Sequence, residues 1–147
     1  MRLALREALV AHSEGEVPVG AVVVRDGVVI GRAHNQVERL KDATAHAEMI
    51  ALTQAAAAVG DWRLNECTLY VTLEPCPMCA GALVNCRLKT LVFGVRDWQM
   101  GGTFSNFGIV QYAKNTHKVE VIEGVSEAEC KELLDSFFSR LRNKKVL

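Results

Sequence analysis

A histidine, a glutamate and two cysteines occur at spacings that suit metal chemistry. His46 and Glu48 lie in the stretch TAHAEM, and Cys76 and Cys79 follow in the stretch PCPMC. Imidazole nitrogen and thiolate sulfur are ligands that Zn²⁺ prefers in proteins. Three such ligands leave the fourth tetrahedral position for water, whose pKa the metal lowers to about 7. The pattern therefore predicts a catalytic zinc site formed by His46, Cys76 and Cys79.

The glutamate in the same stretch is suited to moving protons. A hydrolysis needs a group that takes a proton from water and hands it on, and a carboxylate beside the metal can do this. Positions i and i+2 lie about 200° apart on an ideal helix, so spacing alone does not place His46 and Glu48 on one face. The two side chains share a site only if the helix points its end at the metal.

Two other interpretations fit the same residues. A C-x-x-C pair with an internal proline is also typical of a redox dithiol, although that function leaves His46 and Glu48 without a role. A structural zinc site would need a fourth ligand. Four other side chains could supply it: His12, His34, His117 and Cys86.

The elements that must position these side chains alternate between strands and helices. Five strands are predicted, over residues 19–24, 28–33, 67–73, 89–95 and 118–124, with a hairpin turn at Asp26-Gly27. Four helices are predicted. The first covers the N-terminal stretch and has Leu3, Leu5, Ala8, Leu9 and Ala11 on its apolar side. The second runs from Thr44, its N-cap, to about Val59, the third covers residues 74–86, and the last runs from Ser126, its N-cap, to residue 142. Residues 34–43 are predicted to form a polar loop, and residues 96–114 fit no element. This alternation predicts a three-layer α/β domain with one partly parallel sheet.

Composition limits the size and the partners of the protein. A chain of 147 residues fits a single domain, residues 1–147. Lys plus Arg and Asp plus Glu both number 17, so the formal net charge is zero. This balance argues against a protein that holds nucleic acid by bulk electrostatics, although residues 140–145 (RLRNKK) form a local basic patch.

The apolar runs, the N-terminal stretch and the cysteines indicate where in the cell the protein is located. No apolar run is long enough to span a bilayer, and the N-terminal stretch is amphipathic without a signal-peptide cleavage site. Five cysteines are an odd number in a chain that does not look secreted, so a disulfide framework is not expected. We expect a cytoplasmic protein with no membrane association.

The motifs also carry a family resemblance. HAE followed by PCPMC is similar to the signature of the zinc-dependent cytidine and deoxycytidylate deaminase superfamily. The stretches EVPVGAVVV, TAHAEMIAL, LYVTLEPCPMCAGALV and VFGVRD closely resemble the bacterial tRNA-specific adenosine deaminases. The resemblance implies a cytidine-deaminase-like fold, a five-stranded mixed sheet with helices on both faces, and a homodimer.

The chemistry that the resemblance implies is hydrolytic. His46, Cys76 and Cys79 would hold one Zn²⁺ per subunit, and Glu48 would be the catalytic proton donor. Activated water would attack C6 of adenine, Glu48 would protonate N1, and ammonia would leave, giving inosine. In the family this occurs at the wobble position of the anticodon, chiefly in an arginine tRNA.

The resemblance also implies contacts with the substrate, each beside a simpler interpretation. Asn35 matches a residue that touches the flipped base and its sugar, and Asp97 matches one near the ribose; both could be ordinary loop residues. Val17 and Leu73 match positions that line the base pocket, and both could serve core packing alone. His117 lies near a family histidine beside the RNA, but Thr116 interrupts the usual asparagine-histidine pair.

Two rival functions remain at the level of the sequence. A deaminase of the same fold acting on guanine, cytosine or a nucleoside would share every catalytic residue. The stretches EVPVGAV and LYVTLEPCPMC favour the tRNA enzymes over it. A binding module with a structural zinc would show no turnover, and replacing Glu48 would not affect it.

Overall fold

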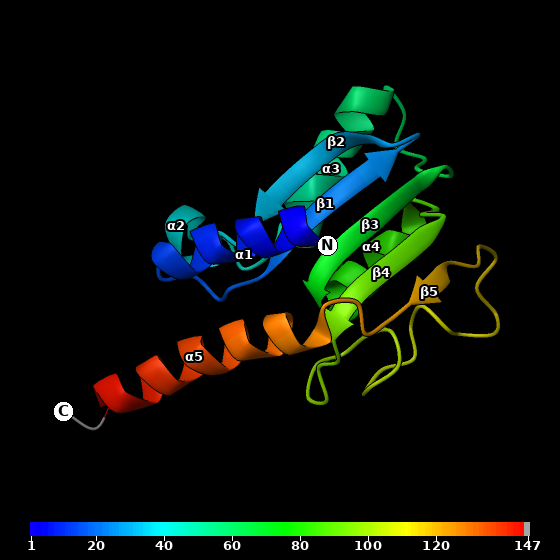
Figure 1. Cartoon of the computed structure of the whole chain (residues 1–147). Coiled ribbons are helices and arrows are strands. Elements are labelled where there is room, and N and C mark those ends of the chain that lie inside the picture. Colours follow the sequence, from blue (N-terminus) through cyan, green and yellow to red (C-terminus); the bar gives the residue numbers. More distant parts are fainter. Residues whose placement is uncertain (146–147) are drawn as a thin grey trace.

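The computed structural model describes residues 1–145, which form a five-stranded sheet covered by helices on both faces (Figure 1). The strands are β1 (Gly20–Arg25), β2 (Val28–His34), β3 (Cys67–Leu73), β4 (Thr90–Val95) and β5 (Glu120–Ile122). The helices are α1 (Arg2–Ser13), α2 (Val37–Leu40), α3 (Ala47–Val59), α4 (Pro77–Asn85) and α5 (Glu127–Lys145).

The sheet is mixed, with strand order β2-β1-β3-β4-β5. β1 pairs antiparallel with β2 and β3, and the β3–β4 and β4–β5 pairs are parallel. The hairpin turns at Asp26 and Gly27, whose φ angles of 50° and 74° are both positive, as a type I′ turn requires. Helices α1 and α5 lie on one face and α3 and α4 on the other (Figure 1). The predicted three-layer α/β fold is confirmed.

Glycines let helices approach the sheet closely. A Cβ added at Gly20 of β1 would lie 1.9 Å from the carbonyl oxygen of Ala4 in α1, and one at Gly31 of β2 would lie 2.4 Å from that of Ala51 in α3. The buried side of α1 is therefore formed by small residues: Ala4, Ala8 and Ala11. The predicted apolar side was partly wrong, because Leu9 is 56% exposed.

Several predicted boundaries or caps were wrong. Helix α4 and strand β5 are shorter than the predicted ranges 74–86 and 118–124, and α5 continues past residue 142. Helix α3 starts at Ala47 with His46 as its N-cap, because the Thr44 side chain instead donates a hydrogen bond to Asp42 Oδ1 (2.7 Å). The predicted polar loop contains helix α2, whose N–H groups find a partner in Glu16. Ser126 directly precedes α5 as predicted, and its carbonyl oxygen accepts a hydrogen bond from the Cys130 N–H (3.1 Å). Its φ of 55° nevertheless lies outside the extended conformation that an N-cap usually adopts.

The chain between β4 and β5 has no helix or strand, in line with the lack of a predicted element over residues 96–114. No helix in the described part of the chain has both the length and the apolar character needed to cross a bilayer.

Candidate metal centre and substrate cavity

The predicted metal ligands lie at the N-termini of two helices. His46 is the N-cap of α3, with φ −74° and ψ 147°, and Cys76 is the N-cap of α4, with φ −68° and ψ 172°. Cys79 lies in the first turn of α4, which begins with Pro77. Because His46 has an extended backbone, helical spacing does not separate its side chain from that of Glu48. The structure thus resolves the geometric difficulty posed by the i, i+2 spacing.

The distances between the ligand atoms suit zinc. His46 Nδ1 lies 3.5 Å from Cys76 Sγ and 3.6 Å from Cys79 Sγ, and all three ligand atoms lie within 4.8 Å of one another. Tetrahedral coordination with ordinary Zn–N and Zn–S bonds separates such atoms by about 3.6 Å. Within residues 1–145 this group has no fourth member: no other histidine, cysteine or acidic side chain lies close enough to join the three ligand atoms.

The four side chains that could have supplied a fourth ligand contact other groups instead. His34 lies between two glutamates, His117 is hydrogen-bonded to the Leu88 carbonyl, and His12 packs edge-on against Phe137. Cys86 donates to the Leu83 carbonyl. The arrangement is therefore that of a three-ligand site.

The site favours the thiolate form of Cys76 even without a metal ion. Hydrogen bonds from Cys79 and, to a lesser degree, from His46 lower the pKa of Cys76 to about 4, although burial opposes this. The pKa of His46 is raised, chiefly by its hydrogen bond with Cys76. Thiolate is the form of cysteine that binds metal. The pKa of the Cys79 thiol is raised, chiefly by its hydrogen bond with Cys76, so the free site favours thiolate at Cys76 only. The donor set fits Zn²⁺, and a bound metal ion would deprotonate the second thiol.

Glu48 lies beside this group and is buried. Its side chain is buried in the first turn of α3, and burial raises its pKa, while contacts with Cys79 and His46 act in the opposite direction. A raised pKa makes a carboxylate a stronger base towards water and suits Glu48 to transferring protons between water and a substrate.

The metal group opens onto a cavity of about 770 Å³. Four of the five predicted substrate-binding residues line it: Val17, Asn35, Leu73 and Asp97. Asn35 is 7% exposed, and its Oδ1 atom has no hydrogen-bond partner among residues 1–145. The Asp97 carboxylate accepts hydrogen bonds from the N–H groups of Gln99 and Met100, both at 3.0 Å. An unpaired buried oxygen at a cavity wall is a binding group for a ligand.

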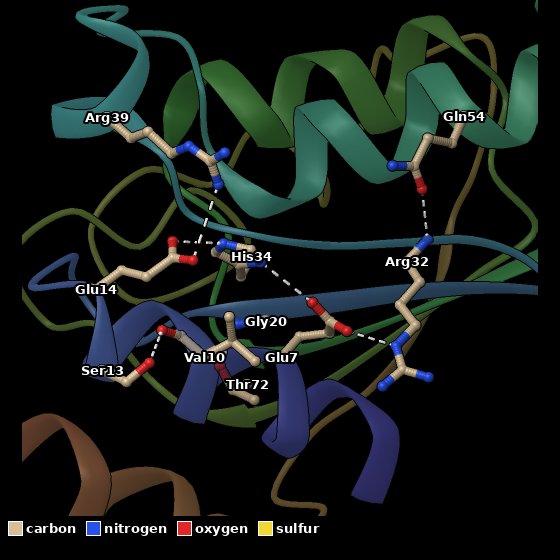
Figure 2. A network of polar contacts seen from close by, with 10 residues as sticks. All are labelled: Glu7, Val10, Ser13, Glu14, Gly20, Arg32, His34, Arg39, Gln54 and Thr72. Carbon is tan, nitrogen blue, oxygen red and sulfur yellow. Dashed lines mark hydrogen bonds and ion pairs between the residues drawn. The ribbon is translucent and has the colours of Figure 1, made fainter.

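A polar network fixes the backbone next to Asn35 (Figure 2). His34 Nδ1 lies 3.2 Å from Glu7 Oε2, and His34 Nε2 lies 2.9 Å from Glu14 Oε2. Glu7 also pairs with Arg32, so α1 and the end of β2 are joined at several points. The network anchors His34, the residue immediately before Asn35, which lines the cavity.

The structure does not bring His117 to the cavity. Its Nε2 atom lies 2.6 Å from the carbonyl oxygen of Leu88, which precedes β4. The metal group follows the end of β3, and β3 and β4 are parallel, so their starts lie at the opposite edge of the sheet.

Two buried carboxylates beside the cavity were missed from the sequence. Glu16 accepts hydrogen bonds from the N–H groups of Glu38 (2.8 Å) and Arg39 (3.3 Å), and Glu74 accepts several from the loop after β4. Glu74 follows an apolar strand and precedes a proline. An acid in such a position must be buried with donors around it, and this signal could have identified it.

Comparison with known proteins places this geometry in a class. The family model described as MafB19-like deaminase matches residues 1–142. The fold and the metal group together define a deaminase with a cytidine-deaminase-like fold. A tRNA-specific adenosine deaminase from Bacillus subtilis (strain 168) is 48% identical over 99% of this chain and 90% of its own length. One from Aquifex aeolicus (strain VF5) is 47% identical over 97% and 94%. The chain belongs to the family of tRNA-specific adenosine deaminases.

A solved structure shows the same architecture. It comes from studies of A-to-I editing by tRNA:A34 deaminases at the wobble position of transfer RNA, and it is 42% identical to this chain. It superimposes with a TM-score of 0.88 and covers 91% of this chain and 97% of its own.

Proposed function

We propose that the protein is a zinc-dependent hydrolase that converts adenosine to inosine at the wobble position of a tRNA anticodon, as a single catalytic domain over residues 1–147. The observation that carries the proposal is the buried Glu48 beside a three-ligand metal group at the wall of a cavity. The relatives named above support RNA as the substrate, because they are similar over nearly the whole chain.

His46, Cys76 and Cys79 are proposed to hold one Zn²⁺ per subunit. The ion, when bound, supplies a positive charge that lowers the pKa of water at the open coordination position towards about 7. Glu48 performs the proton transfers. Its carboxylate accepts a proton from the attacking water, delivers it to N1 of adenine, and then transfers the second proton of that water to the departing ammonia. The atoms balance as adenosine plus water giving inosine plus ammonia.

The cavity wall is proposed to bind the extruded nucleotide. Asn35 offers its unpaired Oδ1 to the base or sugar, Val17 and Leu73 contact the faces of the base, and Asp97 lies near the ribose. The predicted contact of His117 with RNA belongs, on this proposal, to a part of the tRNA outside the cavity.

The partners follow from the substrate. An arginine tRNA with adenosine at the wobble position is the proposed substrate, and the cytoplasm is the proposed location because tRNA is present there. The family resemblance also supports a homodimer, which sedimentation equilibrium of the zinc-loaded protein would detect as twice the chain mass of 16.1 kDa.

The central test is conversion of adenosine in an arginine tRNA transcript. We expect the purified protein to convert the wobble adenosine to inosine, which reverse transcription reads as guanosine. Glu48→Ala should lose at least about 10²-fold in rate, because the proton shuttle is removed. Zinc content, measured by mass spectrometry of the metal, should stay at one per chain in both proteins.

Two outcomes would contradict the proposal. Normal turnover by Glu48→Ala would exclude its role as the shuttle. An inactive wild type that retains its zinc but deaminates free guanine, cytosine or a nucleoside would assign the same site to a small-molecule substrate.

A further inference from the structure

A buried carboxylate next to the metal group has no part in the proton transfers described above. Glu74 is 2% exposed and lies between Leu73, the last residue of β3, and Pro75. Its Oε1 accepts hydrogen bonds from the Asp97 N–H (3.1 Å) and from the Ser105 hydroxyl. Its Oε2 accepts from three N–H groups, those of Thr103 (3.1 Å), Phe104 (3.0 Å) and Ser105 (3.1 Å).

All five donors belong to one segment, residues 97–105, which follows β4. The segment contains no helix or strand, so its conformation does not come from backbone pairing within an element. It supplies Asp97 and Met100 to the lining of the cavity. One carboxylate therefore holds a wall of the cavity that has little regular structure of its own.

The segment also lies close to the backbone of residues 75–76. The Gly102 N–H donates to the Pro75 carbonyl (2.7 Å), and a Cβ added at Gly102 would lie 2.8 Å from the Cys76 carbonyl oxygen. A Cβ at Gly101 would lie 2.4 Å from Glu74 Oε2. The wall is therefore packed directly onto the chain that carries a metal ligand, and a shift of the segment would change its distance from the reacting atoms.

We infer that Glu74 is a positioning residue for substrate: its carboxylate fixes residues 97–105 as the wall that places Asp97 and Met100 against the bound nucleotide. The inference rests on the proposed function, because the nucleotide is the ligand that this wall would contact. Charge-assisted hydrogen bonds are stronger than neutral ones, and water has little access to replace them at a buried carboxylate.

The isosteric change Glu74→Gln separates this role from simple packing. An amide keeps the shape of the side chain but offers only one acceptor oxygen. With that oxygen at the Oε2 position, three N–H donors keep their partner, and the amide nitrogen faces the N–H of Asp97. The change therefore releases the wall specifically at Asp97.

The experiment combines steady-state kinetics on a tRNA anticodon stem-loop, zinc content and amide hydrogen exchange. For Glu74→Gln we expect kcat/KM to fall about tenfold or more, mainly through a higher KM, with zinc still at one per chain. Exchange protection should fall about tenfold at the Asp97 amide, stay near the wild-type level at the amides of Thr103, Phe104 and Ser105, and stay unchanged in β3 and β4. The matched control is Glu123→Gln, which removes an exposed ion pair with Arg96 (2.7 Å), the residue immediately before the segment. It should change neither the KM nor the protection of residues 97–105.

The measurements distinguish failure of the inference about Glu74 from failure of the proposed function. Wild-type KM together with a protected segment in Glu74→Gln would overturn the inference. Loss of zinc, or increased exchange throughout the sheet, would also overturn it, because Glu74 would then stabilise the core rather than the wall. If the wild type fails to deaminate the stem-loop, the proposed function fails, while the exchange data still decide whether Glu74 holds the segment.

Discussion

Asn35 combines burial with an unpaired amide oxygen at the cavity wall. An unpaired buried polar atom costs free energy in the free protein and regains it when a ligand supplies a donor. Activity and stability should therefore respond in opposite directions when this side chain is removed.

For Asn35→Ala we expect kcat/KM on the tRNA stem-loop to fall about 10- to 100-fold, because a hydrogen bond to the substrate is lost. The free energy of unfolding, measured by urea denaturation, should stay the same or rise by up to about 1 kcal/mol. A variant that is fully active but less stable would show instead that Asn35 serves the fold.

Residue types and spacing were enough to predict that His46, Cys76 and Cys79 lie together, because zinc chemistry restricts candidate ligands to a few side chains. They were not enough to predict that the side chains of His46 and Glu48 lie at the same site. That relation depends on the extended backbone of an N-cap, which helical periodicity does not describe. The position of Glu74 after an apolar strand and before Pro75 indicates a buried acid, but its five donors could not be predicted, because they lie more than 20 positions away in sequence and no local pattern identifies them.

At the scale of elements, the contact between α1 and β1 depends on the absence of a side chain at Gly20. For Gly20→Ala we expect the free energy of unfolding to fall by about 3 kcal/mol, because the added methyl group would meet the backbone of α1. Gly81, within α4, provides the matched control, since a Cβ there meets nothing within 4 Å.

Gly81→Ala should raise the free energy of unfolding by about 0.5–1 kcal/mol through helix propensity. Urea denaturation of both variants measures the difference. Equal stability of the two would contradict the close packing of α1 on the sheet.

The elements themselves could be predicted where the signal is local. The hairpin at Asp26-Gly27 and the strand Cys67–Leu73 occur as expected, because turn chemistry and β-branched runs are properties of short segments. The start of α3 was predicted wrongly because Thr44 finds a partner at Asp42. Helix α2 was not predicted, since its N-terminus depends on the distant Glu16.

At the scale of the whole molecule, the balanced charge limits how strongly RNA binding can depend on salt. Four cations near the end of α5 are the local exception: Arg140, Arg142, Lys144 and Lys145. If all four neutralise phosphates, log kcat/KM should fall with log salt with a slope of about −3.

The double variant Lys144→Gln and Lys145→Gln should make this slope less steep by about 1, as measured with stem-loop RNA between low and moderate salt. Lys89→Gln, at the exposed residue just before β4, should leave the slope unchanged. An unaltered slope in the double variant would show that this patch does not touch RNA.

Metal should also affect the stability of the whole molecule, because the ligands come from two different helices. Removing zinc with a chelator should lower the melting temperature by about 10 °C, and added zinc should restore it at one equivalent. Calorimetry measures both. Cys76→Ser should melt like the chelated wild type and gain little from zinc; an identical melting temperature with and without metal would contradict the site.

The position of His46 on one helix and Cys76 on the next, 30 residues further along the chain, has a consequence for the order of events during synthesis. The hairpin and α3 leave the ribosome first and carry His46, Glu48 and Asn35, but half of the site is still missing at that stage. We therefore expect metal to bind only after β3 has paired with β1 and α4 has formed. Zinc binding would then indicate that the segment with His46 and the segment with Cys76 and Cys79 have come together. A nascent chain halted before residue 76 would lack both cysteines and should have no affinity for zinc, so metal uptake would mark completion of the domain.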